Sequence, residues 1–275
     1  MKSLITRHEN GTIELTVTIP TALVKKTRQE ILEEHVKVEE IPGFRKGMAP
    51  IDMVEKSLGE EHIREDILKK LLPQAYVEAI KEHNLNPVIN PKINVQKIDE
   101  GNDWVFVAQT AEGPKVTLDN YKEAVRKVTA KAKIVVPGKE QTPIGFEEVS
   151  VELLKAATFQ IPAIIIDQEV ERLLAQTLDE VKRLGLTLDQ YLASTGRDVD
   201  SLKLEYAAKA EKDIKLEFIL QEIAKQEGIK VEEKEIDEAI AQSKTEAERQ
   251  NLQNNRRLLS NIIRQQKTLD FLRNL

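Results

Sequence analysis

The sequence predicts a mainly α-helical protein with two domains, an α+β domain over residues 1–112 and an elongated all-α domain over residues 150–275. Apolar and polar residues alternate from Thr12 to Ile19, which is the period of a half-buried strand. From residue 164 onward the apolar residues instead recur at helical spacing. The chain of 275 residues also exceeds the length at which a single core usually stops growing, which favours two domains.

Two hairpins are expected at the ends of the first domain. Asn10-Gly11 is a turn signal that joins residues 4–8 to the strand over residues 12–19. Near the end of the domain, a polar turn joins residues 90–98 to residues 104–110, and both segments are rich in strand-forming residues. Strands therefore enclose the helical part of this domain, which is the order of an α+β unit.

Three helices are expected between the hairpins, over residues 21–41, 50–58 and 61–83. Thr21 is placed to cap the first helix, and Pro50 is placed to begin the second. Gly59 is expected to end the second helix, and Pro73 to interrupt or kink the third.

Residues 113–149 are expected to form a linker with one basic helix. Lysines and arginines, including Lys133 and Lys139, crowd this stretch, which ends in Pro137-Gly138 and Pro143-Ile144-Gly145. Glycines then divide the rest of the chain into helical segments. These helices are expected over residues 164–184, 188–194, 199–226, 232–243 and 247–272.

The composition excludes several classes of protein and site. The chain has no cysteine, so it has no disulfide, thiolate nucleophile or thiolate metal site. No stretch approaches the roughly 20 apolar residues that a bilayer span requires, and the N-terminus has no apolar leader, so we expect a cytoplasmic protein without a membrane partner. The net charge of -6 argues against a generally cationic surface, so any contact with RNA must use a local patch.

No catalytic or metal-binding motif is recognisable. The four histidines lie far apart in the sequence, and no two have the spacing of a zinc motif. Nucleophile elbows, phosphate-binding loops and dinucleotide fingerprints are also absent. We therefore expect no catalytic residue, no cofactor and no metal, and we interpret all four histidines as surface or packing residues: His8, His35, His62 and His83.

The loop from Gly43 to Pro50 stands out as a candidate docking site. It places an aromatic ring and two cations, Phe44, Arg45 and Lys46, between Gly43 and Gly47. The glycines permit sharp turns at a helix-to-helix connection, and the cations suit a carboxylate or phosphate partner. In the alternative interpretation, Phe44 packs into its own core and the two cations are ordinary surface charge.

The residues of this loop, GFRKGMAP, resemble the signature of the trigger factor family of ribosome-associated chaperones, and EDILKKLLPQAYVEAIKEHNLNPVINPKI extends the resemblance downstream. In the second half, IPAIIIDQEVERLL, LGLTLDQYLASTG and LEYAAKAEKDIKLEFILQEIAKQEGIKV resemble the helical, substrate-cradling domain of the same family, in the same order. The resemblance covers most of residues 1–112 and 150–275.

The resemblance implies an ATP-independent chaperone that holds nascent or unfolded polypeptides and docks at the ribosomal tunnel exit. The family's ribosome-binding residues, which contact ribosomal protein and 23S rRNA, match Gly43, Phe44, Arg45, Lys46 and Gly47. Eight apolar residues of the second half are candidates for the surface that cradles the substrate: Ile164, Ile165, Leu173, Phe218, Leu220, Ile262, Ile263 and Phe271.

Two departures from the family pattern keep alternatives open. The family often has a lysine where this chain has Met48, and acidic residues outnumber basic ones in the first domain. Both features favour a ribosome-independent chaperone or assembly factor that uses the same cradle as a homodimer. The family's FKBP-like isomerase domain also has no counterpart in residues 113–149, where the aromatic residues are Tyr121 and Phe146, so we expect no isomerase activity.

Overall fold

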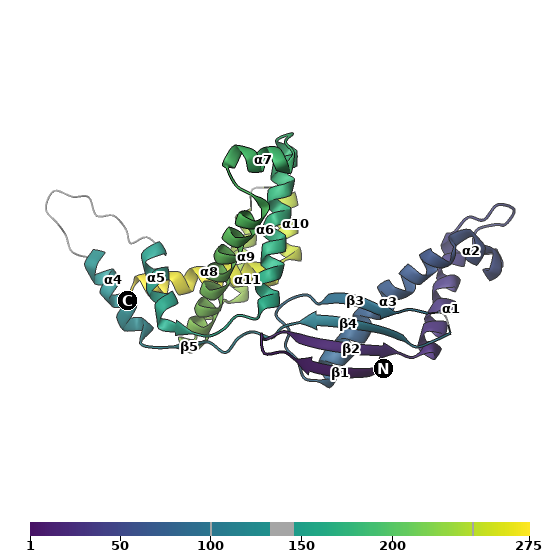
Figure 1. Ribbon diagram of the computed structural model, residues 1–275, viewed down its shortest axis with the longest axis horizontal. Coiled ribbons are helices and arrows are strands. Elements are labelled where there is room, and N and C mark those ends of the chain that lie inside the picture. Colours follow the sequence, from purple (N-terminus) through teal and green to yellow (C-terminus); the bar gives the residue numbers. More distant parts are fainter. Residues whose placement is uncertain (100, 133–145, 244) are drawn as a thin grey trace. The chain divides into compact units, whose positions relative to one another are not determined.

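The computed structural model describes residues 1–99, 101–132, 146–243 and 245–275 (Figure 1). The chain divides into two compact units. The first comprises residues 1–113 with 162–164, and the second comprises residues 114–161 with 165–275. Helices predominate and a small sheet lies in the first unit, which confirms the predicted fold class. Among the described residues, no helix combines the length and the apolar composition that crossing a membrane requires.

The sheet of the first unit contains both predicted hairpins. Its strands are β1 (Lys2–Arg7), β2 (Ile13–Ile19), β3 (Lys92–Lys97) and β4 (Trp104–Thr110), in the order β1-β2-β4-β3, and each neighbouring pair is antiparallel. The register places Val17 opposite both Ser3 and Phe106. Alternate residues of β2 are buried, as the period of the sequence predicts.

Three helices complete the first unit, α1 (Thr21–Val38), α2 (Ile51–Leu58) and α3 (Glu60–Glu82). Side chains of α1 and α3, among them Ile31 and Ile67, pack with the buried side chains of β2 and β4 in one core. Pro73 lies inside α3 without ending it, so of the two predicted effects the interruption is wrong, and the kink stays a prediction. Leu71 and Ala75 on either side are fully buried, and this packing outweighs the hydrogen bond that the proline removes.

Thr21 is the first residue of α1 and not its cap, which corrects the predicted role. Its backbone N–H and its hydroxyl both donate to Asp103 Oδ1, each at 2.9 Å. Asp103 precedes β4, so this pair of hydrogen bonds connects the start of the helix to the sheet. Pro50 likewise lies one residue before α2, at the cap position.

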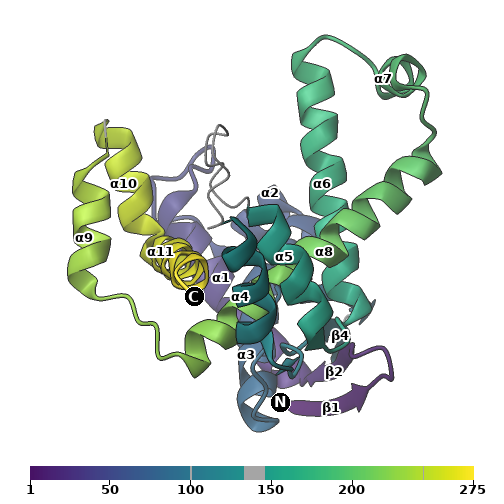
Figure 2. The ribbon, with the colours of Figure 1, turned by 90° about the vertical axis from the view of Figure 1, so that its left-hand side faces the viewer.

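The second unit is helical apart from one short strand pair, β5 (Thr117–Leu118) with β6 (Ala157–Thr158). Figure 2 shows α7 at one end of the long pair α6 and α8. The helices of this unit are α4 (Tyr121–Ala132), α5 (Phe146–Ala156), α6 (Ala163–Arg183), α7 (Leu188–Thr195), α8 (Val199–Gln226), α9 (Glu233–Ala241), α10 (Glu246–Asn254) and α11 (Arg256–Arg273).

The segment expected to be a linker differs in the structure, because helices α4 and α5 belong to the core of the second unit. Tyr121 and Val125 of α4 are buried with Val149 of α5 and with side chains of α8 and α11. The Tyr121 hydroxyl also donates to Glu227 Oε1 at 2.7 Å. Among the basic residues of α4, Arg126 and Lys127 are exposed, whereas Lys122 pairs with Glu227 Oε1 at 2.7 Å beside Tyr121. Lys133, Lys139 and the motifs Pro137-Gly138 and Pro143-Ile144-Gly145 lie outside the described residues.

The last predicted helix, residues 247–272, is two helices in the structure. The break falls at Asn255, between α10 and α11. The Asn255 side chain donates to the backbone oxygen of Asn251 at 2.9 Å. Asparagine side chains that bond to nearby backbone groups compete with helical hydrogen bonds, which accounts for the interruption.

Candidate functional site

The backbone of the signature loop, defined here as residues 41–49, forms two consecutive turns. The Phe44 N–H donates to the oxygen of Ile41 at 3.0 Å, and the Met48 N–H donates to the oxygen of Arg45 at 2.9 Å. Gly43 and Gly47 occupy the third position of these turns, with φ of 90° and 83°. A type II turn requires a positive φ there, which only glycine adopts without strain.

A small apolar cluster anchors both ends of the signature loop. Ile41 and Ala49 are buried against Val54 of α2, and Val36 and Leu58 pack around them. Because the two ends are buried and the turns are hydrogen-bonded, the five residues between Gly43 and Ala49 are presented in a defined conformation. The loop therefore consists of two hydrogen-bonded turns between buried ends.

The side chains of the signature loop that are candidates for docking are exposed to solvent. Phe44 is 42% exposed and Met48 74% exposed, and Phe44 is not part of the anchoring cluster. Arg45 and Lys46 are exposed, and no carboxylate among the described residues pairs with either cation. The structure thus disagrees with the interpretation in which Phe44 packs into its own core.

Arg28 of α1 holds the three helices around the loop together. Its guanidinium donates to Glu55 of α2 and to Glu60 of α3, each with a contact of 2.6 Å. The hydrogen bond from Arg28 lowers the pKa of the Glu60 carboxyl below its usual value, against the opposing effect of burial. Paired hydrogen bonds between arginine and carboxylate fix geometry as well as charge, so Arg28 positions α2 and the loop that precedes it.

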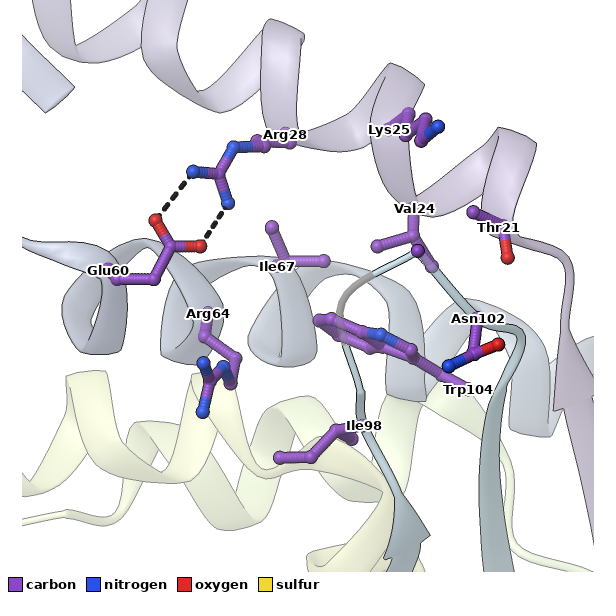
Figure 3. Close-up of a pocket in the computed structure, with 11 residues that line it drawn as sticks. Thr21, Val24, Lys25, Arg28, Glu60, Arg64, Ile67, Ile98, Asn102 and Trp104 are labelled. Carbon is purple, nitrogen blue, oxygen red and sulfur yellow. Dashed lines mark hydrogen bonds and ion pairs between the residues drawn. The ribbon is translucent and has the colours of Figure 1, made fainter.

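A pocket of about 190 Å³ lies beside this ion pair (Figure 3). Trp104, Val24 and Ile67 form its apolar surface, and Lys25 and Arg64 lie at its edge. Small-molecule sites usually occupy about 300–1,000 Å³, so this pocket is small for an organic ligand. None of the residues that resemble the family's docking loop lines it.

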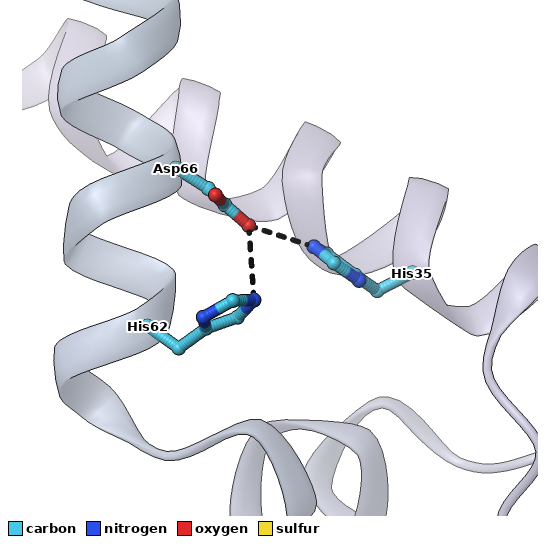
Figure 4. A group of neighbouring side chains, drawn as sticks. All are labelled: His35, His62 and Asp66. Carbon is cyan, nitrogen blue, oxygen red and sulfur yellow. Dashed lines mark hydrogen bonds and ion pairs between the residues drawn. The ribbon is translucent and has the colours of Figure 1, made fainter. Parts of the chain in front are cut away.

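The structure brings together two histidines that the sequence analysis treated as separate. His35 of α1 lies with His62 and Asp66 of α3 (Figure 4). Burial raises the pKa of Asp66, but hydrogen bonds with His35 and Lys69 outweigh it and leave the pKa below its usual value. The sequence held one part of this signal, since His62 and Asp66 are four residues apart on a helix. The packing of α1 on α3 supplies His35.

The eight cradle candidates are distributed over buried and exposed positions. Ile164, Ile165 and Leu220 are buried, and Leu220 belongs to the core of the second unit. Ile262 is 53% exposed. The remaining four are half-buried: Leu173, Phe218, Ile263 and Phe271. Phe271 packs against the core of the second unit. The Phe218 ring stacks edge-on with the Phe159 ring, and their centroids are 6.4 Å apart.

Other exposed apolar residues, which sequence reasoning missed, lie at the end of the α6–α8 pair near α7. We call Leu184, Leu186, Val199 and Leu204 the arm-end residues; Leu184 and Leu204 are each 73% exposed. Leu184 and Leu186 flank Gly185, where the Leu186 N–H donates to the oxygen of Val181 at 3.1 Å and ends α6. The signal in the sequence that could have identified Leu184 and Leu186 is their position on either side of a glycine that ends a helix.

A second apolar surface lies between α8 and α11. Leu258 and Ile262, one helical turn apart on α11, are both exposed and line a cavity of about 170 Å³. Leu220 and Ala224 of α8 contribute to the same lining. Charged and amide side chains surround these residues, including Glu217 and Arg264.

Comparisons with known proteins agree in both halves of the chain. The family model described as bacterial trigger factor protein (TF) matches residues 1–140. The family model described as bacterial trigger factor protein (TF) C-terminus matches residues 117–274. Each match covers more than half of the 275 residues, and the two overlap at residues 117–140.

Curated relatives of this chain are trigger factors. Trigger factor of Staphylococcus epidermidis is 42% identical over 108 residues, which are 39% of this chain and 25% of that protein. Trigger factor of Staphylococcus aureus is 40% identical over 108 residues, with the same coverage. These matches span a quarter of the relatives' length.

The solved structure, reported for promiscuous substrate recognition in folding and assembly activities of the trigger factor chaperone, matches with a TM-score of 0.60 and 14% identity. The match covers 100% of this chain and 99% of the other, and at this identity it shows a shared fold. The two family models establish the relationship, and the chain belongs to the bacterial trigger factor family.

Proposed function

We propose that this protein is an ATP-independent chaperone that docks at the ribosomal tunnel exit and holds nascent or unfolded polypeptides. Membership of the trigger factor family supports this function. The observation that carries the docking step is the signature loop, whose two exposed cations pair with no carboxylate among the described residues. Docking at the ribosome would place the protein in the cytoplasm.

The chemistry of the signature loop suits a ribosomal surface of RNA and protein. Arg45 can form two parallel hydrogen bonds to a phosphate or a carboxylate, and Lys46 adds a point charge. Phe44 and Met48 supply apolar area beside these cations. Because the loop is already ordered by its two turns, binding costs little conformational entropy. We assign 23S rRNA to the cations and a ribosomal protein to the apolar side chains.

The helical unit has the surface that a holdase needs. Its exposed leucines, valines and isoleucine come from several segments of the chain, with charged residues between them in the sequence. Isolated apolar contacts of this kind bind weakly and release, whereas a contiguous patch promotes aggregation. We assign contact with unfolded chains to the arm-end residues and to the surface formed by Leu258 and Ile262. No step of such binding requires ATP.

A ribosome-independent chaperone, acting as a homodimer, is the second candidate. Met48 favours it, because an apolar side chain that is 74% exposed replaces a cation of the family pattern. The excess of acidic residues in the first 115 residues favours it as well, since phosphate contacts supply much of the affinity for RNA.

We also propose that the protein lacks prolyl isomerase activity. The two family models meet without an unmatched segment between them, which supports this proposal. Residues 114–132 and 146–161 supply helices and strands to the core of the helical unit, so they are used for another structural purpose.

The first prediction tests docking. The triple variant Phe44→Ala, Arg45→Ala, Lys46→Ala should bind 70S ribosomes at least tenfold more weakly in co-sedimentation at physiological salt. Removing two phosphate contacts should also lower the slope of log affinity against log salt by about 2. Because all three side chains are exposed, the free energy of unfolding should change by about 0.5 kcal/mol or less.

The matched control is Leu4→Ala, Lys25→Ala, Lys26→Ala, which removes one exposed apolar residue and two exposed cations from other parts of the first unit. It should co-sediment as the unmodified protein does. Equal binding by the two triple variants would refute the assignment of the loop. A protein that never co-sediments with ribosomes would support the ribosome-independent candidate instead.

The second prediction tests the holding step. We consider the triple variant Leu184→Ser, Leu186→Ser, Leu204→Ser, with ATP absent throughout. The concentration of this variant that halves the aggregation of a denatured model protein should be severalfold higher than that of the unmodified protein. These side chains are exposed, so the thermal midpoint should stay nearly constant. The control is Lys182→Ser, Asp189→Ser, Lys203→Ser, which changes exposed polar residues of α6, α7 and α8 close in sequence to the substituted leucines. If the control loses as much activity as the leucine variant, the arm-end residues have no special role.

The third prediction concerns catalysis. Uncatalysed prolyl isomerisation takes tens of seconds or more, so catalysis is easily measured. The purified protein should leave the rate for a prolyl peptide unchanged at micromolar concentration. A rate enhancement that persists when the protein is prepared from a host without its own isomerases would contradict the proposal.

A further inference from the structure

The cluster of His35, His62 and Asp66 has the dimensions of a metal site. One ligand atom of each residue lies within 4.8 Å of the others. His35 Nε2 is 3.0 Å and His62 Nε2 is 3.6 Å from the same oxygen, Asp66 Oδ2. Ligand atoms that each lie about 2.1 Å from a tetrahedral zinc ion are about 3.4 Å from one another. The two measured distances lie on either side of that value.

The orientation of the rings also fits a shared ion. Figure 4 shows both imidazoles directed at the Asp66 carboxylate, one from α1 and one from α3. On its other side, His35 Nδ1 lies 3.6 Å from Glu39 Oε1. Histidines that bind metals usually donate their second ring N–H to a carboxylate or carbonyl, the position that Glu39 occupies beside His35. An ion would replace the proton in the hydrogen bond of 3.0 Å between His35 Nε2 and Asp66 Oδ2. His62 and Asp66, one helical turn apart, present their side chains on one face of α3.

We propose that His35, His62 and Asp66 bind one divalent transition-metal ion of the zinc type. Imidazole ligands favour zinc, copper and nickel, whereas magnesium and calcium require a shell of oxygen atoms. The His62 side chain is half exposed, so an ion can enter and a water molecule can complete the tetrahedral coordination. This site lies outside the signature loop and outside the apolar surfaces of the helical unit.

Metal binding would connect α1, which precedes the signature loop, to α3, which follows the loop and α2. His35 is in the last turn of α1, six residues before Ile41, and His62 is in the first turn of α3. An ion that joins α1 to α3 therefore stabilises the base on which the loop and α2 are held. One feature opposes it, because Lys69 Nζ donates to Asp66 Oδ1 at 3.1 Å and places a positive charge near the ion.

The test uses the full chain without a polyhistidine tag, stripped of metal with a chelator and titrated with zinc chloride by calorimetry. We expect one zinc ion per chain and an increase of the thermal midpoint, since a ligand that binds only the folded state stabilises it. Cobalt(II) should bind in the same place and give the visible absorption of a tetrahedral site. His62→Ala should weaken zinc binding at least tenfold and abolish the increase of the thermal midpoint.

The matched control is His8→Ala, because His8 is also exposed and also lies 3.6 Å from a carboxylate oxygen, that of Glu14. It should bind zinc as the unmodified protein does. Lys69→Gln removes the opposing charge and should tighten zinc binding severalfold. Absence of stoichiometric binding, or equal binding by His62→Ala and the unmodified protein, would overturn the proposal.

Discussion

The Arg28 guanidinium joins three helices of the first unit, and the placement of the signature loop depends on it. Arg28 contacts Glu55 on α2 and Glu60 on α3, so both carboxylates satisfy one planar cation. Exposed ion pairs contribute little to stability, but the Arg28 side chain is half-buried and its hydrogen bonds to the two carboxylates are paired. With α2 fixed, Val54 can bury Ile41 and Ala49, and these two residues hold the loop between them.

The two units present surfaces of different chemistry. In the first unit, several cations are neutralised within the fold, as Lys70 is by Glu30 and Glu34, whereas Arg45 and Lys46 remain exposed on the loop. In the helical unit, the exposed groups that stand out are apolar and dispersed. A docking contact benefits from defined charge geometry, and contact with many unfolded sequences benefits from apolar groups without a fixed pattern. The proposed function assigns one task to each surface.

Local patterns in the sequence predicted much of the fold. The alternation in β2 and the bounds of α8 depend on neighbouring residues, so they could be read directly. The role of residues 113–149 could not be predicted from the sequence, because Tyr121 and Val125 form a core only when they pack against α8 and α11. For the same reason the sequence could not separate buried Leu220 from exposed Ile262, and it could not bring His35 beside His62. The signature loop was found because its glycines, ring and cations are contiguous.

The separation of docking from holding is the central claim, and site-specific photo-crosslinking tests it most directly. A photoreactive amino acid is placed in the full chain at either Phe44 or Leu184, which are both exposed, and mixed with ribosomes stalled on an unfolded nascent chain. The account predicts that the probe at position 44 crosslinks to ribosomal protein or 23S rRNA and that the probe at position 184 crosslinks to the nascent chain. Crosslinks from position 44 to the nascent chain, together with crosslinks from position 184 to the ribosome, would contradict it.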